Sequence, residues 1–150
     1  MRLTAYTDYS LRVLIYLASK EDHSLSNIKE ISIAYGISKN HLMKVTYELG
    51  KMGVIETIRG RNGGIRLAHA PSEINIGKIV RQTEEDFFLV DCFNPDSPRP
   101  CVISPVCGLT HALNKALLAY LKVLDGYTLA DLVQNPAAYR EFFKKKLESE

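Results

Sequence analysis

The chain has 150 residues, 46% of them hydrophobic, and a formal net charge of +2. That hydrophobic content supports one packed domain and excludes a mainly disordered chain. The small net charge does not by itself indicate a nucleic-acid partner, so any basic surface must come from local clustering of lysine and arginine. Charged residues interrupt the first twenty positions, and no run of 18 apolar residues occurs. We therefore expect a cytoplasmic protein without a membrane-spanning helix.

Three helices are expected in the first third of the chain. Apolar residues recur at helical spacing over residues 7–20, 26–36 and 38–53, with Thr7, Ser26 and Ser38 as the expected N-caps. Gly36, in the short turn "YGIS", is expected to end the second helix. Two helices joined in this way are typical of a helix-turn-helix, which we place from Ile28 to Lys51. On these helices alone, an ordinary helical hairpin is the alternative.

The next segment favours a winged helix. Residues 54–68, "VIETIRGRNGGIRLA", predict a strand, a turn and a strand, with "NGG" supplying positive φ in the turn. A hairpin directly after a helix-turn-helix has the position of a wing. Arg59, Arg61 and Arg66 lie within eight residues, so charge is concentrated here although the net charge is small.

The third helix and the wing supply candidate DNA contacts. A recognition helix presents its N-terminal residues to base edges in the major groove, and arginine suits a narrow minor groove. Asn40 can bond adenine at two points. A solvated polar face is the alternative for some of these side chains. The full set is Ser38, Lys39, Asn40, His41, Lys44, Tyr47, Arg59, Arg61 and Arg66.

The second half of the chain predicts mostly helix. We expect a short amphipathic helix over 74–84 and a long helix from Gly108 to just before Gly126, then a short helix and a solvated tail. The apolar face of the long helix is wide enough that a second copy would cover it. The expected fold is mainly α with a small β-hairpin wing. Its parts are a winged helix-turn-helix over 1–84, a cysteine loop over 85–107, and a dimerisation helix with C-terminal tail over 108–150.

All three cysteines, Cys92, Cys101 and Cys107, fall within the proline-rich stretch 91–107. In the cytoplasm such a cluster indicates metal binding or reactivity rather than a disulfide framework. Soft thiolates suit an iron–sulfur cluster or zinc, and three of them leave one ligand short. His111, one helical turn beyond Cys107, is the local candidate for the fourth ligand.

Several alternatives are open at this point. The cysteines could be structural, or could form a thiol-redox switch in a winged-helix regulator, or could bind a stabilising zinc ion. A Cys107–His111 dyad would suit an enzyme. Neither a third catalytic partner nor a glycine-rich pocket loop accompanies that pair in the sequence.

The segments "TDYSLR", "ISKNHLMKV", "RGRNGGIRL" and "CVISPVCGL" resemble the winged-helix iron–sulfur transcription regulators, most of all their nitric-oxide-sensing members, over about residues 1–135. The resemblance implies a homodimeric repressor that binds double-stranded palindromic operator DNA and releases it in response to nitric oxide. It also implies one cluster per subunit, 4Fe–4S rather than 2Fe–2S. The ligands would be the three cysteines and Asp8 of the other subunit, with His111 as second choice. Arg12, at i+4, is positioned to pair with Asp8.

Overall fold

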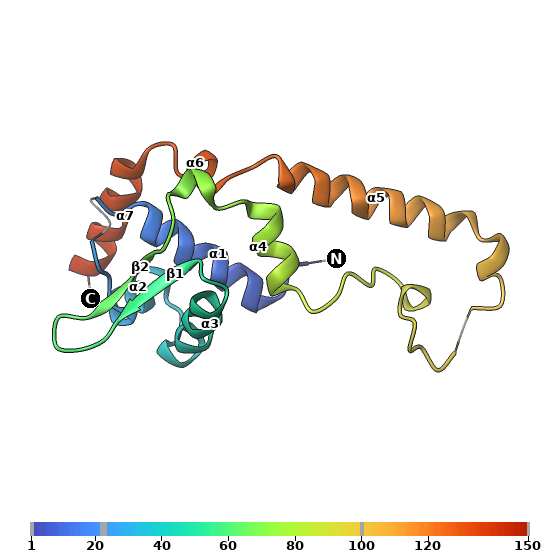
Figure 1. Cartoon of the computed structure of the whole chain (residues 1–150), viewed down its shortest axis with the longest axis horizontal. Coiled ribbons are helices and arrows are strands. Elements are labelled where there is room, and N and C mark those ends of the chain that lie inside the picture. Colours follow the sequence, from blue (N-terminus) through green and yellow to red (C-terminus); the bar gives the residue numbers. More distant parts are fainter. Residues whose placement is uncertain (1, 22–23, 100, 150) are drawn as a thin grey trace.

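The computed structural model describes residues 2–21, 24–99 and 101–149; Pro100 of the cysteine loop lies outside these ranges. A helical body carries a two-stranded hairpin at one end and a long arm at the other (Figure 1). This confirms a mainly α fold with a small hairpin. The elements are α1 Ala5–Ala18, α2 Ile28–Tyr35, α3 Lys39–Lys51, β1 Ile55–Ile58, β2 Gly64–Leu67, α4 Ile76–Thr83, α5 Gly108–Asp125, α6 Leu129–Leu132 and α7 Pro136–Glu148.

Helix α1 is the centre of the body. Its Val13, Leu14 and Tyr16 side chains are fully buried, and the helix contacts α2, α3, α4, α6 and β2. The apolar residues that recur along the neighbouring helices face this core; Ile31 of α2 and Leu42 of α3 are among them. Burying side chains of this size stabilises a fold by about 1.5–3 kcal/mol each, so the body is held mainly by the packing around α1.

The ends of the first helices differ in part from expectation. Ser38 caps α3 by accepting a hydrogen bond from the His41 N–H, as predicted. The two other predicted caps are wrong: Thr4 caps α1 and Asn27 caps α2. The predicted residues lie one position or one turn away and are buried instead. Each true cap precedes its helix with an extended backbone and an exposed side chain that accepts from the third helical N–H.

The hairpin pairs β1 with β2 antiparallel, from Ile55 opposite Leu67 to Ile58 opposite Gly64. Ser26 exchanges backbone hydrogen bonds of 2.9 and 2.8 Å with Ile65, which ties the hairpin to the chain just before α2. In the turn, Gly60 has a positive φ of 110°, whereas Gly63 and Gly64 do not, so the two glycines of "NGG" do not supply the predicted positive φ. Gly64 is required by close approach instead, because an added Cβ would lie 2.7 Å from the Ser26 carbonyl oxygen.

The C-terminal segment is a packed helix where a short helix and a solvated tail were expected. Helix α7 runs to Glu148, and its Phe143 ring lies 4.8 Å from the Tyr16 ring and 5.3 Å from the Tyr35 ring, between centroids. Arg140 donates to the Ser19 carbonyl oxygen at 2.9 Å. The last helix therefore packs against α1 and α2 rather than extending into solvent.

The arm is formed by residues 85–99 and 101–107, which lead away from the body, and by α5, which returns to it (Figure 1). At the body, the Arg81 guanidinium forms an ion pair with the Asp125 carboxylate, with Nη2 to Oδ2 at 2.9 Å. The Asn75 amide donates to the Asp125 carbonyl oxygen at 2.8 Å. These bonds fix the end of α5 to α4. None of the helices in the described ranges has the length and apolar character needed to cross a bilayer.

Candidate DNA-binding surface and cysteine site

Helix α3 has one buried and one exposed face. Leu42, Val45 and Leu49 face the core at 2% exposure or less. The six residues predicted to contact DNA lie on the other face and are all exposed: Ser38, Lys39, Asn40, His41, Lys44 and Tyr47. The fold therefore leaves the predicted recognition face open to a partner.

Two aromatic side chains of this face, His41 and Tyr47, contact other side chains of the same chain. The His41 ring stacks on Tyr9 of α1, with centroids 5.9 Å apart and planes at 29°. The Lys51 Nζ lies 5.5 Å from the Tyr47 ring centroid and 3.0 Å from Glu48 Oε2. These contacts orient both rings at the surface.

The wing arginines fall into two kinds. Arg59 and Arg61 are exposed in the turn between β1 and β2. Arg66 lies on β2 opposite Glu56, and its Nε donates to Glu56 Oε2 at 3.0 Å. Because that ion pair offsets its charge, Arg66 is a weaker candidate for a DNA contact than Arg59 and Arg61, which form the basic tip of the wing.

Asp8 lies in the first turn of α1 and forms the predicted pair with Arg12, whose Nε donates to Asp8 Oδ1 at 2.9 Å. The pKa of the Arg12 guanidinium is raised, chiefly by this hydrogen bond. The guanidinium carbon also lies 5.7 Å from the Tyr35 ring centroid. Burial raises the pKa of the Tyr35 hydroxyl well above its usual value, so this ring remains neutral beside the ion pair.

The three cysteines are free thiols on the arm. Cys92 lies in a single 3-10 turn, Asp91–Phe93, while Cys107 immediately precedes α5 and Cys101 is exposed between them. The Cys92 Sγ lies 3.8 Å from the Thr110 hydroxyl oxygen. The pKa of the Cys107 thiol is lowered by the hydroxyl of Thr110, then by the backbone N–H groups of Thr110 and Leu109. Cys92 and Cys107 therefore share Thr110 as a neighbour.

The single chain does not assemble the whole predicted ligand set. Within the described ranges, no three His, Cys, Asp or Glu side chains form a group able to hold a metal ion. Asp8 lies in α1 of the body, whereas Cys107 directly precedes α5 on the arm that extends from the body (Figure 1). His111 is exposed and lines, with Cys107 and Phe93, an open cavity of about 680 Å³. Thr110 was not among the predicted site residues.

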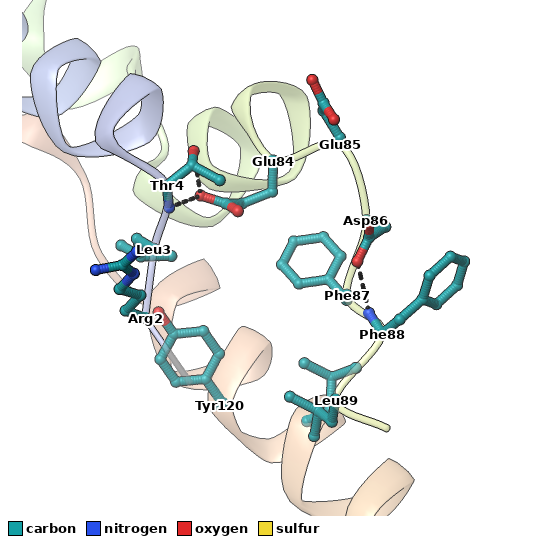
Figure 2. A pocket seen from close by; sticks show the side chains of 11 residues that line it. Arg2, Leu3, Thr4, Glu84, Glu85, Asp86, Phe87, Phe88, Leu89 and Tyr120 are labelled. Carbon is teal, nitrogen blue, oxygen red and sulfur yellow. Dashed lines mark hydrogen bonds between the residues drawn. The ribbon is translucent and has the colours of Figure 1, made fainter. Parts of the chain in front are cut away.

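A second cavity of about 650 Å³ lies where the N-terminus meets the start of the arm (Figure 2). There the backbone N–H and hydroxyl of Thr4 both donate to Glu84 Oε1, at 2.8 and 3.0 Å. Phe87, Leu89 and Tyr120 supply apolar walls (Figure 2). This cavity contains none of the predicted cluster ligands. The hydrogen bonds between Thr4 and Glu84 connect the start of α1 to the segment that leads to Cys92.

Comparison with known proteins identifies the family. The Rrf2 family model, described as an iron-dependent transcriptional regulator, matches residues 3–135. The chain belongs to the Rrf2 family. It is 65% identical to the HTH-type transcriptional regulator NsrR of Bacillus licheniformis, over 90% of this chain and 94% of that protein. It is 62% identical to the HTH-type transcriptional regulator NsrR of Bacillus subtilis, over 97% of this chain and 99% of that protein.

The structural comparison agrees with this Rrf2 assignment. CymR, the global cysteine regulator of Bacillus subtilis, matches with a TM-score of 0.71 at 26% identity, over 89% of this chain and 97% of that one. The winged-helix fold expected from the sequence is therefore confirmed. The chain is a DNA-binding transcriptional regulator and not an enzyme, since its Rrf2 relatives are transcription regulators. The Cys107–His111 dyad is thus set aside as a catalytic pair.

Proposed function

We propose that this Rrf2 regulator is a homodimeric repressor that releases palindromic operator DNA when nitric oxide reaches an iron–sulfur cluster. The cluster, 4Fe–4S rather than 2Fe–2S, would be held by Cys92, Cys101 and Cys107 of one subunit and Asp8 of the other. The main support is the gathering of three free thiols on one arm, with the Cys92 Sγ 3.8 Å from the Thr110 hydroxyl of α5. The likeness to regulators named NsrR supports the signal.

The donor set fits such a cluster chemically. Thiolates are the usual ligands of iron–sulfur clusters, and the lowered pKa of Cys107 favours the thiolate form that a metal needs. In its described residues, 91–99 and 101–107, the segment that carries the three sulfurs has only single 3-10 turns, so it can adjust around a ligand more easily than a helix can. When bound, the cluster would supply iron atoms with which nitric oxide reacts.

Asp8 fits the role of a ligand from across a dimer. It lies in α1, which belongs to the body of its own chain and not to the arm that carries the cysteines (Figure 1). Arg12 binds Oδ1 of this carboxylate, and Oδ2 has no hydrogen bond within the described part of the chain. The ion pair orients the carboxylate at the first turn of α1, so Asp8 can offer its second oxygen without giving up Arg12.

A dimer is supported by the surface of α5. Leu109, Leu118 and Val123 are each at least 60% exposed on this helix. Leu109 and Val123 lie on the same side of the helix, and exposed apolar side chains that share one side indicate a protein interface, whereas Leu118 lies on the opposite side. Pairing two arms would place each cysteine segment near the partner's body and would hold two copies of α3 at a fixed separation, which a palindromic operator requires.

The cross-subunit ligand can be tested with a mixed dimer. One subunit would carry Asp8→Ala and the other Cys101→Ser, with different affinity tags to purify the mixture. If Asp8 acts across the dimer, one site keeps all its ligands, and half the wild-type cluster remains with a wild-type absorbance spectrum. If the fourth ligand is instead His111 of the same chain, Asp8→Ala has no effect on the cluster. Every site that keeps its three cysteines, in the Asp8→Ala homodimer and in the mixed dimer, then has a wild-type absorbance spectrum. A spectrum altered by Asp8→Ala alone, with no rescue in the mixed dimer, would refute the cross-subunit arrangement.

A further inference from the structure

We infer that Glu84 is a positioning residue for operator binding. It fixes the start of α1 to the beginning of the arm, so the position of the arm is transmitted through α1 to the recognition helix α3. This role requires only the DNA-binding activity of the regulator, and neither iron nor nitric oxide enters it.

The link between the two elements consists of two hydrogen bonds to one carboxylate oxygen. The backbone N–H and the hydroxyl of Thr4 donate to Glu84 Oε1 at 2.8 and 3.0 Å, although the two residues are 80 positions apart in sequence (Figure 2). Thr4 is the N-cap of α1, and Glu84 directly follows α4, where the chain enters the arm. Hydrogen bonds to an ionised acceptor are stronger than those to a neutral one, so this link resists separation of the two elements.

The link has the pattern of a capping box whose parts come from two helices. In an ordinary capping box, the third residue of the helix is Glu or Gln, and its side chain accepts from the N–H of the N-cap. The third residue of α1 is Thr7, whose own N–H donates to the Thr4 hydroxyl oxygen at 3.3 Å. Glu84 supplies the carboxylate that Thr7 lacks. The first turn of α1 is therefore complete only when the end of α4 lies against it.

The start of α1 also faces the recognition helix. Tyr9, in the second turn of α1, stacks on His41 of α3 with the ring centroids 5.9 Å apart. Tyr6 of α1 and Glu48 of α3 line, together with Glu84, a cavity of about 470 Å³. The first two turns of α1 thus connect the beginning of the arm to α3, and a shift of Glu84 reaches the exposed face of α3 through them.

A link of this kind acts on specificity more than on general affinity for DNA. Base contacts depend on the exact position of α3, whereas phosphate contacts carry no sequence information and tolerate a small shift. Loss of the link should therefore weaken binding to the operator and leave binding to unrelated DNA nearly unchanged. A residue that only stabilised the fold would change neither affinity while the protein stays folded.

The test compares three variants at a temperature where circular dichroism shows all of them folded. The probe is a duplex that the wild-type protein selects from a random-sequence library, with a scrambled duplex beside it, and binding is measured by fluorescence anisotropy. Glu84→Ala removes the acceptor, and we expect about five- to tenfold weaker binding to the selected duplex, with a change of about twofold or less on the scrambled one. Glu84→Gln keeps a carbonyl oxygen at the end of the side chain and should restore binding to within about twofold of the parent.

Glu85→Ala is the matched control. Glu85 carries the same charge, lines the same cavity and is exposed, and it forms no hydrogen bond or ion pair in the part of the chain that the structure describes. This variant should bind the selected duplex as the parent does.

Transmission through α1 is tested by a double substitution. Tyr9→Leu removes the stack on His41 and keeps an apolar side chain. If the link acts on α3 through the start of α1, the two substitutions are coupled. Adding Glu84→Ala to Tyr9→Leu should then weaken binding to the selected duplex by about twofold or less, well below the effect of Glu84→Ala in the parent.

Unchanged binding of the selected duplex by Glu84→Ala would overturn the inference. So would an equal loss on both duplexes, an equal loss in Glu84→Gln, or a matching loss in Glu85→Ala. A full effect of Glu84→Ala in the Tyr9→Leu background would also overturn it, because the link would then act by another route. The iron content of every sample would be measured: iron-free wild-type protein would refute the proposed cluster and leave the comparison among the variants valid.

Discussion

The junction between α4 and α5 makes a quantitative prediction about Gly77. This residue is buried in α4 where the end of α5 crosses it. A Cβ at Gly77 would collide with the Asp125 carboxylate and would lie 2.8 Å from the Asp125 backbone nitrogen and 3.0 Å from Arg81 Nη1. The carboxylate could rotate away only by giving up its ion pair with Arg81, but the backbone nitrogen can move only if α5 moves. Gly77→Ala should therefore separate the arm from the body.

The expected cost follows from comparison with a second helical glycine. Gly50 lies in α3, and an added Cβ there would meet no atom within 4 Å. Both substitutions gain about 0.5–1 kcal/mol of helix propensity. Only Gly77→Ala adds the overpacking term of about 1–3 kcal/mol. The loss of a partly exposed ion pair adds little, since such pairs contribute about 0–1 kcal/mol.

Urea denaturation of both variants, followed by circular dichroism, gives the comparison directly. We expect Gly77→Ala to be less stable than Gly50→Ala by about 1–3 kcal/mol. The same variant should show a smaller difference in operator affinity between nitric-oxide-treated and untreated protein, because the arm no longer moves with α4. If Gly77→Ala were as stable as Gly50→Ala, the close packing at this junction would not be a determinant of the fold.

The remaining predictions concern the DNA face and the C-terminal helix. Asn40→Ala should cost about 1–3 kcal/mol at one base position of the operator, measured by fluorescence anisotropy with base-substituted sites, and an equal loss on every sequence would mean a backbone contact instead. Arg61→Ala should weaken binding to all sequences alike and lower the salt dependence, whereas an unchanged salt slope would remove the wing tip from the interface. Phe143→Ala should lower the free energy of unfolding by about 1.5–3 kcal/mol, because the partly buried ring packs against Tyr16 and Tyr35. Its neighbour Phe142 is 74% exposed, so Phe142→Ala should change stability by about 0.5 kcal/mol or less, and similar losses in both would contradict the packing of α7.

Much of the fold could be predicted because apolar spacing is a strong signal. The repeats in α1 and α3 face the core as expected, and Ile55 and Ile65 of the hairpin face it too, whereas Thr57 and Ile58 are exposed. The caps were harder, since two or more Ser, Thr or Asn residues stand near each helix start and only the backbone conformation chooses between them. Thr4 and Asn27 are the N-caps because each directly precedes the first helical residue and has an extended backbone.

The C-terminal helix was misjudged for a different reason. Its three consecutive lysines indicate a solvated tail, yet Tyr139 and Phe143 lie on one face at i and i+4 and reach the aromatic cluster around Tyr16. A helix with one short apolar stripe packs against the protein only if the rest of the chain presents an apolar surface to that stripe, and otherwise it extends into solvent. That surface is formed by α1 and α2, more than a hundred residues earlier, and the local pattern does not reveal it.

The cysteine site was predicted in outline because cysteine is rare and all three lie in one segment. Thr110 was missed, since threonine is common at helix starts and its position three residues after Cys107 is the only local sign. The contact that singles it out joins it to Cys92, 18 residues upstream. The ligand set itself stays a prediction, because Asp8 and the cysteines do not meet within one chain.

The central claim is that iron and sulfide on the arm control DNA binding, and one measurement tests it directly. Protein purified without oxygen would be assayed for iron, acid-labile sulfide and zinc, and the same sample would be titrated with operator DNA before and after exposure to nitric oxide. We expect iron and sulfide in near-equal amounts, about four of each per subunit for a 4Fe–4S cluster, with tight DNA binding that nitric oxide abolishes. Protein with zinc or no metal at all, which binds the operator equally well before and after nitric oxide, would contradict the proposal.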